Sequence, residues 1–427
     1  MGFVDELRWR NMLHDMTPGI EDYLNSGVRR AYIGFDPTAP SLGIGNFVQI
    51  MILAHFQRSG HQPVVIIGGA TGRIGDPSGK DKERDLKTEE ELEQNIQAQL
   101  KQIKKLLNFE TGENKALLIN NYDFYKDMTV LHFLRDVGKN ASVNTMLAKE
   151  SVKRRLETGI SYTEFSYQLL QAYDFYCLYK DHDCRVQMGG SDQWGNIIAG
   201  TDYINKNISE AQAYALTTPL LTKSDGKKFG KTEEGNIWLD PNLTSPYQFY
   251  QYWLNVDDAD LNKLYRYFSF LNQQEIEQLE KEYKDQPNTL KRIFATELTS
   301  RLHGEQVCKN VESVTDILFN KNLSSDKLKE MNEDVFKLCC QEIPSYSLPF
   351  ESIRQGVPIL NLLAEQSQIC SSKSQARRAI QGNAIQINKD KISDAEMIIS
   401  ADHFIHEKYL LVENGKKNKF ILQIIKP

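Results

Sequence analysis

A glycine-rich turn near the N-terminus has the composition of a phosphate-binding turn. The segment YIGFDPTAPSLGIGN, residues 32–46, runs from an apolar stretch through a proline-containing turn to Gly43 and Gly45, and a helical pattern begins near Asn46. A strand, a glycine-rich turn and a helix start present backbone N–H groups and a positive helix end to phosphate. Plain turns of this composition are also common, so the segment alone favours neither interpretation.

A lysine-rich segment further along the chain has the charge needed to act on phosphates. The segment KSDGKKFGKT, residues 223–232, contains four lysines in ten positions. In a flexible loop, Lys228 and Lys231 can fold over a triphosphate and neutralise the charge of departing pyrophosphate. Taken alone, a solvated basic loop is the favoured interpretation.

A polar stripe runs along an otherwise apolar helical pattern at residues 161–179. Tyr167, Gln171 and Asp174 are spaced by four and three residues, so they share one helix face. Because their neighbours are apolar or aromatic, this face is expected to line a polar pocket within a core. A buried aspartate satisfied by local hydrogen bonds is the alternative.

Two more glycine-containing segments carry acidic and basic side chains. QMGGSDQWGN, residues 187–196, places Asp192 at a strand-to-helix turn, where a carboxylate can accept ribose hydroxyls. GGATGRIGDPSGKDKER, residues 68–84, contains Asp76, which can hold an ammonium group, and Lys80 and Arg84, which can hold phosphate. For Asp192 the simpler explanation is helix capping. For residues 68–84 it is an ordinary glycine-rich surface loop.

The elements that must position these residues alternate in type. Short apolar runs at 31–36, 63–69, 116–120 and 184–190 predict strands. A helical pattern at 87–107 lies between them and opens with the capping-box spacing of Thr88 and Glu91. Alternating strands and helices predict an α/β domain with a parallel sheet.

The rest of the chain changes character from Ser245. Pro246 follows this capping serine, and the helical patterns that come next show no strand signal until about residue 320. A polar and proline-containing stretch then suggests a linker before a small final unit with one helix pattern and short alternating strands. We therefore expect an α/β domain, an all-helical domain, a linker and a small α+β domain, at residues 1–222, 223–325, 326–354 and 355–427.

Composition sets limits on the class of protein. The chain has 427 residues, of which 40% are hydrophobic and 25% charged, with a formal net charge of −6. This composition disfavours a disordered or fibrous protein, and no apolar run approaches the roughly 20 residues of a membrane helix. The six cysteines show no metal-binding spacing and no disulfide framework. We expect a cytosolic protein with free thiols, no metal site and no membrane partner. A net charge of +3 over 351–427 hints weakly at nucleic acid.

The order of these segments resembles that of bacterial-type tyrosyl-tRNA synthetases, which are class I aminoacyl-tRNA synthetases. SLGIGN stands where the class has its HIGH signature, and KFGKT stands for KMSKS. GFDPTAPSL, GDPSGK, YQLLQAYD and GGSDQWGN are also similar to family segments, and the likeness spans essentially the whole chain. The resemblance implies a Rossmann-like catalytic domain with inserted dimer-forming helices, a helical domain and a small ribosomal-protein-like RNA-binding domain.

The resemblance also implies an activity and its site. The expected enzyme is a ligase that activates L-tyrosine with ATP and Mg²⁺ and transfers it to the terminal adenosine of tRNA(Tyr), as a homodimer and without a tightly bound cofactor. The expected tyrosine-binding residues are Tyr32, Asp76, Tyr167, Gln171, Asp174, Gln187 and Gln193. The expected ATP-binding residues are Gly34, Asp36, Gly43, Gly45, Asn46, Gly190, Asp192 and Lys231. The expected catalytic residues are Thr38, Lys80, Arg84, Lys228, Lys231 and Thr232, and tRNA would contact Lys373, Arg377 and Arg378.

The chain departs from the family pattern at the HIGH signature. Gly43 and Asn46 stand where the family has histidines, so one side-chain donor near the phosphates is missing. Two alternatives follow from the sequence. The related synthetase that activates tryptophan shares the fold and signatures, although Asp174 with Tyr32 favours a phenol. An RNA-binding protein on a synthetase scaffold with lapsed chemistry is the second.

Overall fold

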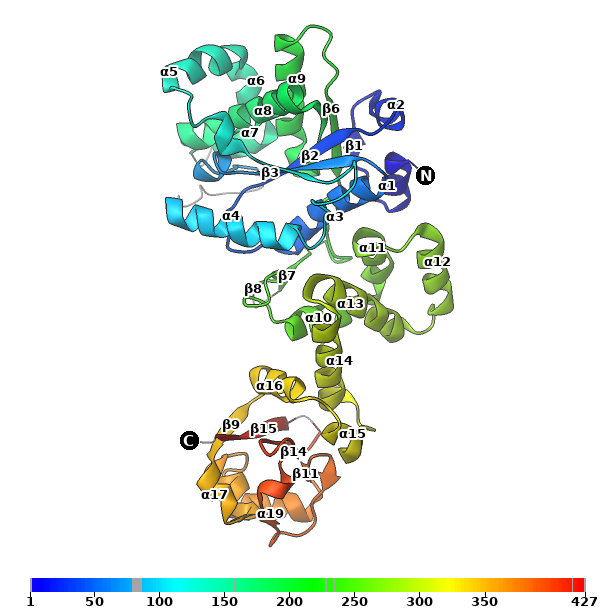
Figure 1. Ribbon diagram of the computed structural model, residues 1–427, viewed down its shortest axis with the longest axis vertical. Coiled ribbons are helices and arrows are strands. Elements are labelled where there is room, and N and C mark those ends of the chain that lie inside the picture. The colour runs from blue at the N-terminus through cyan, green and yellow to red at the C-terminus, as the bar shows by residue number, and fades with distance from the viewer. Residues whose placement is uncertain are drawn as a thin grey trace. The chain divides into compact units, whose positions relative to one another are not determined.

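The computed structural model describes residues 2–78, 87–156, 159–226, 229–232, 235–416 and 418–425, without the side chains of residues 150, 151, 154, 231 and 232. It divides into two compact units, Met1–Leu302 and His303–Pro427. Figure 1 shows the elements of both units.

The first unit is built on a six-stranded sheet with the order β1-β6-β5-β2-β3-β4. Strands β2 to β6 run parallel to their neighbours, and β1 pairs antiparallel with β6 at one edge. Helices α3 and α4 lie on one side of the sheet and α8 and α9 on the other (Figure 1). The α/β prediction is therefore confirmed. The strand order reverses between β2 and β5, and this is the switch point where such sheets bind ligands.

The strands of this sheet are β1 (Asp15–Met16), β2 (Arg30–Phe35), β3 (Gln62–Ile67), β4 (Leu117–Asn120), β5 (Cys184–Gly190) and β6 (Tyr214–Thr218). The four predicted strands are present. Sequence analysis missed β6, although all five of its residues are buried. Its sequence YALTT lacks the valines and isoleucines that identify a buried parallel strand.

The helices of the first unit follow their sequence signals. Thr88 and Glu91 form the predicted capping box, and Ser245 caps the helix that Pro246 begins. The α-helices are α1 (Phe3–Trp9), α2 (Ile20–Asn25), α3 (Ile44–Arg58), α4 (Glu89–Ile103), α5 (Val130–His132), α6 (Val143–Leu147), α7 (Glu150–Leu156), α8 (Tyr162–His182), α9 (Trp194–Asn207), α10 (Pro246–Leu254), α11 (Asp258–Phe268), α12 (Gln273–Glu282) and α13 (Pro287–His303). Helices α10 to α13 match the all-helical block expected after Ser245.

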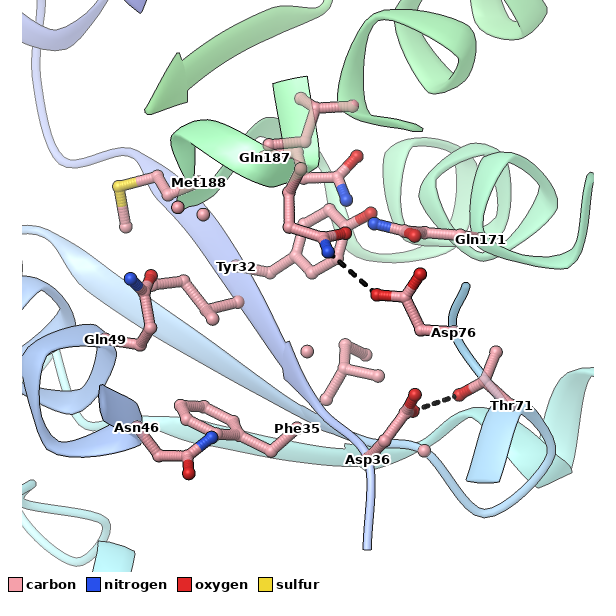
Figure 2. A pocket seen from close by; sticks show the side chains of 18 of the residues that line it. Tyr32, Phe35, Asp36, Asn46, Gln49, Thr71, Asp76, Gln171, Gln187 and Met188 are labelled. Carbon is pink, nitrogen blue, oxygen red and sulfur yellow. Dashed lines mark hydrogen bonds between the residues drawn. The ribbon is translucent and has the colours of Figure 1, made fainter. Parts of the chain in front are cut away.

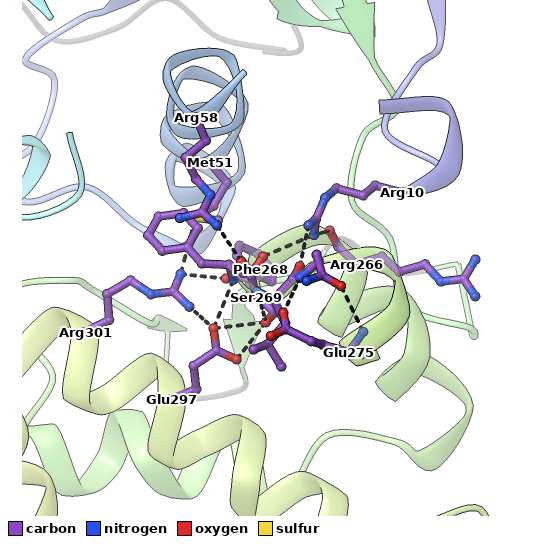
Figure 3. Close-up of polar contacts among 12 residues, drawn as sticks. Arg10, Met51, Arg58, Arg266, Phe268, Ser269, Glu275, Glu297 and Arg301 are labelled. Atoms are coloured by element: carbon purple, nitrogen blue, oxygen red, sulfur yellow. Dashed lines mark hydrogen bonds and ion pairs between the residues drawn. The ribbon is translucent and has the colours of Figure 1, made fainter. Parts of the chain in front are cut away.

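Arginine side chains bind this helical block to the α/β domain (Figure 3). Arg10 is 2% exposed and donates to three backbone carbonyls of the 266–271 segment at 2.7–3.1 Å. Arg58 and Arg301 donate to two more carbonyls there, at 2.9 and 2.7 Å. Glu297 accepts hydrogen bonds from the same segment and pairs with Arg301. Because α11 ends in this segment, the guanidinium groups satisfy carbonyls that have no partner in the helix.

The second unit contains a five-stranded sheet with the order β12-β11-β14-β15-β9. Its main strands are β9 (Ser345–Pro349), β11 (Ile385–Ile387), β12 (Asp390–Lys391), β14 (Tyr409–Asn414) and β15 (Asn418–Ile425), and β10 (Val357–Pro358) pairs with β13 (Ile398–Ile399). Its α-helices are α14 (Glu305–Phe319), α15 (Ser325–Lys329), α16 (Glu333–Glu342), α17 (Phe350–Arg354), α18 (Ile359–Asn361) and α19 (Lys373–Gln381). Residues 326–354, which we expected to form a linker, thus contain α16, α17 and β9, and β9 is a strand of the sheet.

Helix α14 belongs to this second unit because lysines hold its C-terminal end. Lys389 Nζ and Lys419 Nζ both donate to the carbonyl of Ile317, at 2.6 and 3.4 Å, and both pair with the buried Glu413. Cations at the C-terminus of a helix bind its free carbonyls and oppose its dipole. The boundary of the compact units therefore falls at residue 303, before α14. The finer division into separate domains remains a prediction.

None of the helices in the described ranges is long and apolar enough to cross a membrane.

Replacing Arg10 by alanine is expected to destabilise the first unit by about 3 kcal/mol, because the buried Ser269 carbonyl and the partly buried Arg266 and Leu271 carbonyls lose a charged donor. Urea unfolding followed by tryptophan fluorescence measures this, since Trp9, Trp194, Trp238 and Trp253 all lie in that unit. Arg8→Ala is the control: Arg8 is 43% exposed, its ion pairs are screened by water, and its loss should hardly move the midpoint. Equal midpoints for the two variants would contradict a stabilising role for the Arg10 contacts.

Candidate active site

A polar pocket opens at the carboxyl ends of β2, β3 and β5, at the switch point of the sheet. Figure 2 shows Tyr32, Gln171, Gln187 and Asp76 around this pocket. It brings together nearly all the described residues that we expected to bind tyrosine or ATP. Those lining it are Tyr32, Gly34, Asp36, Thr38, Gly45, Asn46, Asp76, Tyr167, Gln171, Asp174, Gln187, Gly190, Asp192 and Gln193.

Four polar atoms of residues that line this pocket are buried and have no hydrogen-bond partner among the described residues. They are the Tyr32 hydroxyl, Gln49 Oε1, Gln171 Oε1 and Gln187 Oε1. Tyr32 is 2% exposed, and burial followed by the nearby Asp174 charge raises the pKa of its hydroxyl well above the usual value. Tyr32 therefore keeps its proton. Buried polar groups are normally paired, so these atoms mark positions that a polar ligand would complete.

The Asp174 carboxylate lies in the same buried region and is 3% exposed. Its Oδ2 accepts a hydrogen bond from Asn121 Nδ2 at 2.9 Å, and its Oδ1 accepts one from the Tyr125 hydroxyl at 2.7 Å. Burial raises the pKa of Asp174 to about 7, although both hydrogen bonds act against this shift, and the charge of Asp36 adds to it. The carboxylate therefore changes its protonation state near neutral pH.

Asp36 connects two walls of the pocket. Its Oδ2 accepts a hydrogen bond from the Tyr167 hydroxyl at 2.9 Å. Its Oδ1 accepts one from Thr71 Oγ1 at 2.7 Å, which Figure 2 marks with a dashed line. Asn121 Nδ2 in turn donates to Thr71 Oγ1 at 3.0 Å. Asp36 and Asp174 thus belong to one hydrogen-bonded network, which fixes the orientation of Tyr167.

Asp76 occupies another wall, in the segment that follows β3. Its Oδ2 accepts a hydrogen bond from Gln193 Nε2 at 2.8 Å, as the dashed line in Figure 2 marks. The Ser78 backbone N–H donates to Asp76 Oδ1 at 2.8 Å, and Asn196 Nδ2 donates to Ser78 Oγ at 3.2 Å. The carboxylate is therefore positioned by the start of α9 as well as by its own loop.

The start of α3 forms the side of the pocket expected to hold phosphate. Gly45 and Asn46 line the pocket, whereas Gly43 is absent from the lining among the described residues. Gly43 is the N-cap of α3, and its N–H donates to Asn46 Oδ1 at 3.3 Å. Asn46 therefore caps its own helix. A Cβ on Gly190 would lie 2.6 Å from Asp192 Oδ1, so this glycine leaves room for the carboxylate.

The lysine-rich loop is anchored by hydrogen bonds near both of its ends. At the start of the loop, Ser224 N–H donates to Asp260 Oδ1 at 2.9 Å, and Lys263 Nζ donates to the carbonyl of Thr222, the residue before the loop, at 2.9 Å. Within it, Gly230 N–H donates to the Tyr252 hydroxyl at 3.1 Å. The predicted Lys80, Arg84 and Lys228, and the side chains of Lys231 and Thr232, lie outside the described residues.

The glycine of this loop has a specific backbone role. Gly230 has φ +83°, and a Cβ on it would lie 2.8 Å from the Cβ of Ile44. Ile44 is the first residue of α3. The loop backbone thus packs directly against the helix start that carries the HIGH-like segment, and only glycine combines this contact with a positive φ.

The predicted RNA-binding residues lie on α19 in the second unit. Lys373 pairs with Glu365 and Arg377 with Glu396, each at 2.8 Å, and all four side chains are exposed. Arg378 is also exposed and donates to the Ser374 carbonyl at 3.4 Å. The helix therefore presents three cations to solvent.

Sequence analysis missed the residues that orient the carboxylates. Thr71, Asn121 and Tyr125 each bind Asp36 or Asp174, and Asn196 supports the loop of Asp76. None of them shows a helix or strand periodicity that points to the site. The only available signal was position, because Asn121 directly follows a predicted strand at the edge where ligands bind.

The free energy of unfolding of the ligand-free protein is expected to fall as the pH rises from about 4 to about 7, by up to about 1.4 kcal/mol per pH unit. In this window the folded state keeps a proton on Asp174 that the unfolded state releases, because the folded pKa is raised from 3.8 to about 7. Asp174→Asn should remove this part of the slope in urea unfolding. The control Asp181→Asn changes an exposed position in α8 and should retain the slope. Identical slopes in wild type and both variants would contradict the assignment of the slope to Asp174.

Comparisons with known proteins agree with this geometry. A family model described as tRNA synthetases class I (W and Y) matches residues 25–320, and one described as the tyrosine–tRNA ligase SYY-like C-terminal domain matches 335–422. The tyrosine–tRNA ligase of Cytophaga hutchinsonii is 48% identical over 425 residues, and that of Bacteroides fragilis is 47% identical over 429 residues, each with 99% of both chains covered.

Solved structures give the same result. A C-terminally truncated mitochondrial tyrosyl-tRNA synthetase from Aspergillus nidulans superposes with a TM-score of 0.66 and 29% identity, covering 74% of this chain and 94% of its own. An Archaeoglobus fulgidus tyrosyl-tRNA synthetase, solved with L-tyrosine, shares the fold with a TM-score of 0.54 at 16% identity, covering 72% of this chain and 99% of its own. Matched along almost its whole length, the chain belongs to the tyrosine–tRNA ligase family of class I tRNA synthetases.

Proposed function

We propose that this chain activates L-tyrosine with ATP, releasing pyrophosphate, and transfers the tyrosyl group from tyrosyl-adenylate to the terminal adenosine of tRNA(Tyr). One observation carries the choice of amino acid: the buried Tyr32 hydroxyl has no partner among the described residues and lies in one pocket with the buried Asp174 carboxylate. A donor and an acceptor buried together suit a phenolic hydroxyl, which accepts and donates one hydrogen bond each.

Selectivity for tyrosine follows from the same pair. With phenylalanine in the pocket, Tyr32 and Asp174 would be desolvated without the hydroxyl that completes them, which is costly for buried polar groups. An indole N–H could use Asp174 as an acceptor but would offer nothing to the Tyr32 donor. The pocket therefore favours tyrosine over tryptophan, the substrate of the related synthetase.

The remaining tyrosine-binding roles follow the polar walls of the pocket. Asp76, Tyr167 and Gln171 would surround the ammonium group, because a carboxylate and neutral oxygens are suitable acceptors for its protons. Gln193, which already bonds Asp76, would lie near the substrate carboxyl group, and Gln187 would complete the pocket. These placements leave the reacting carboxylate facing the ATP side.

ATP would bind along the start of α3 and the end of β5. Gly34, Asp36, Gly45, Asn46 and Gly190 line this side, and Asp192 would accept the ribose hydroxyls. Thr38, Lys80, Arg84, Lys228, Lys231 and Thr232 would surround the phosphates. We assign Mg²⁺ to the ATP substrate, because this cation is commonly held by substrate phosphates.

The reaction needs positioning and charge stabilisation rather than a protein nucleophile. The tyrosine carboxylate attacks the α-phosphorus of ATP and pyrophosphate leaves, so both reactants must be held in line while lysines stabilise the growing charge. Gly43 supplies no side-chain donor here, and one missing preorganised donor typically costs about 3 kcal/mol of transition-state stabilisation. We therefore expect slower activation than in a site with histidine at this position.

Two partners are part of the proposal. Exposed apolar side chains gather between residues 130 and 162, which supports a homodimer contact, because monomers rarely expose such groups together. They are Val130, Leu131, Leu134, Val143, Leu156 and Tyr162.

In the second unit, Lys373, Arg377 and Arg378 would bind the tRNA backbone, so binding should weaken with rising salt. We place the enzyme in the cytosol, where its tRNA is used.

ATP/pyrophosphate exchange with purified full-length protein tests the proposal, with tyrosine, tryptophan and phenylalanine offered separately and without tRNA. We expect exchange with tyrosine alone, and its loss in Asp174→Ala with the fold retained by circular dichroism. Exchange with tryptophan would overturn the substrate assignment. Absence of exchange with all three amino acids, in protein that still binds tRNA, would favour an RNA-binding protein without catalysis.

The contact between the lysine loop and α3 generates a second prediction. Gly230→Ala should lower kcat for exchange at least about tenfold, because the added Cβ meets Ile44 and displaces the loop from the helix start. Gly226→Ala is the matched control: Gly226 has the same φ of +83°, but no described atom lies within 4 Å of its Cβ position. Equal losses in both variants would show that backbone strain, not the contact with α3, limits activity.

A further inference from the structure

Tyr125 makes a contact with the tyrosine pocket from outside it. Its hydroxyl donates to Asp174 Oδ1 at 2.7 Å, yet Tyr125 is not among the described residues that line the pocket. The residue follows η2 (Asn121–Phe124), the 3-10 turn after β4. Its ring lies 5.7 Å from that of Tyr173 and 6.3 Å from that of Phe133, so aromatic packing holds it in place.

The Tyr125 hydroxyl has one hydrogen and two acceptors. Besides Asp174 Oδ1, the carbonyl of Leu170 lies 2.9 Å from it. An ionised carboxylate is the stronger acceptor, so the hydrogen points to Asp174 when that group is charged. Burial and the Asp174 charge raise the pKa of Tyr125 well above its usual value, so the hydroxyl remains a donor.

The surroundings of Asp174 otherwise disfavour its charge. The facing titratable groups are Tyr32 and Asp36 from β2 and its C-terminal end, Tyr167 and Cys177 from α8, and Tyr125 itself. Asp36 repels a second negative charge, and Tyr167 already donates to Asp36. Among the described residues, Asn121 and Tyr125 are thus the donors that stabilise the ionised form of Asp174.

We propose that Tyr125 is a positioning and specificity-determining residue, whose hydroxyl holds the Asp174 carboxylate as an acceptor for the phenolic hydroxyl of the substrate. This rests on the proposed function. With Asp174 ionised, the substrate hydroxyl donates to Asp174 and accepts from Tyr32, so all three groups are paired. With Asp174 protonated, the phenol would face a neutral carboxyl group, and its hydrogen bond to Asp174 loses the strength that an ionised acceptor provides.

Tyrosine binding in the wild-type protein should therefore weaken as the pH falls through about 7, where Asp174 gains its proton. Without the Tyr125 donor, the ionised form is less stable, so the same loss occurs at higher pH. The kinetic constant that reports this ionisation is kcat/KM for tyrosine, because it follows the protonation state of the free enzyme.

The test compares Tyr125→Phe with wild type in tyrosine-dependent ATP/pyrophosphate exchange between pH 6 and 9. Removing one hydrogen bond to a charged group should move the acid limb of kcat/KM for tyrosine upward by about one pH unit. This predicts a loss of about fivefold at pH 7 that shrinks below about twofold at pH 9. The KM for ATP should stay unchanged. Tyr173→Phe, in the same aromatic cluster, is the matched control and should follow the wild-type profile.

Three results would overturn the inference: a Tyr125→Phe profile that overlays wild type, a loss of equal size at every pH, or the same shift in Tyr173→Phe. A loss of equal size at every pH, or the same shift in Tyr173→Phe, would indicate a general packing role. Equal thermal midpoints of the variants and wild type would exclude unfolding as the cause of any loss of activity. Failure of the proposed function is distinct, because wild-type protein would then show no tyrosine-dependent exchange at any pH.

Discussion

The proposed tyrosine pocket depends on a carboxylate that is buried where water cannot solvate it. Asp174 is 3% exposed, and burial alone would favour its neutral form. Two donors from another segment satisfy this carboxylate: Asn121 and Tyr125 lie in the turn after β4, whereas Asp174 itself lies on α8. The order of strands in the sheet brings these segments together at the switch point. The proposed selectivity for a phenol would thus be a consequence of how one buried charge is satisfied.

The same principle operates where the helical block meets the α/β domain. Backbone carbonyls of the 266–271 segment lose their helical partners as α11 ends, and Arg10, Arg58 and Arg301 replace them. Helix α11 also holds the base of the lysine loop through Asp260 and Lys263. A chain of rigid contacts therefore runs from α3, through the arginines and α11, to the loop that is proposed to act on the phosphates. Precise placement of that loop relative to the HIGH-like segment is what catalysis by positioning requires.

Helix α3 has a role at both of its ends. Its N-terminus carries Gly45 and Asn46 into the pocket and packs against Gly230 of the lysine loop. Its C-terminus carries Arg58, which binds the segment after α11. The two signature segments are consequently in contact with one mostly buried helix. The replacement of family histidines by Gly43 and Asn46 changes side-chain chemistry at the helix start without changing this framework.

Local sequence was enough to predict the main elements and most of the lining of the site. Alternation of apolar runs and helical patterns predicted strands β2, β3, β4 and β5, and the caps at Thr88 and Ser245 marked where α4 and α10 begin. Glycines and charged residues at strand ends located the pocket, because parallel strands bring their carboxyl ends to one edge. Tertiary structure alone decided the rest. Side chains that bind partners tens to hundreds of residues away are one example, namely Thr71, Asn121, Tyr125 and Arg10. Strand β6 is a strand because of burial rather than composition. Strand β9 joins a sheet whose other strands all follow it in the chain. Hydrogen bonds between distant segments leave no periodicity in a sequence, so only folding reveals which buried polar group satisfies which.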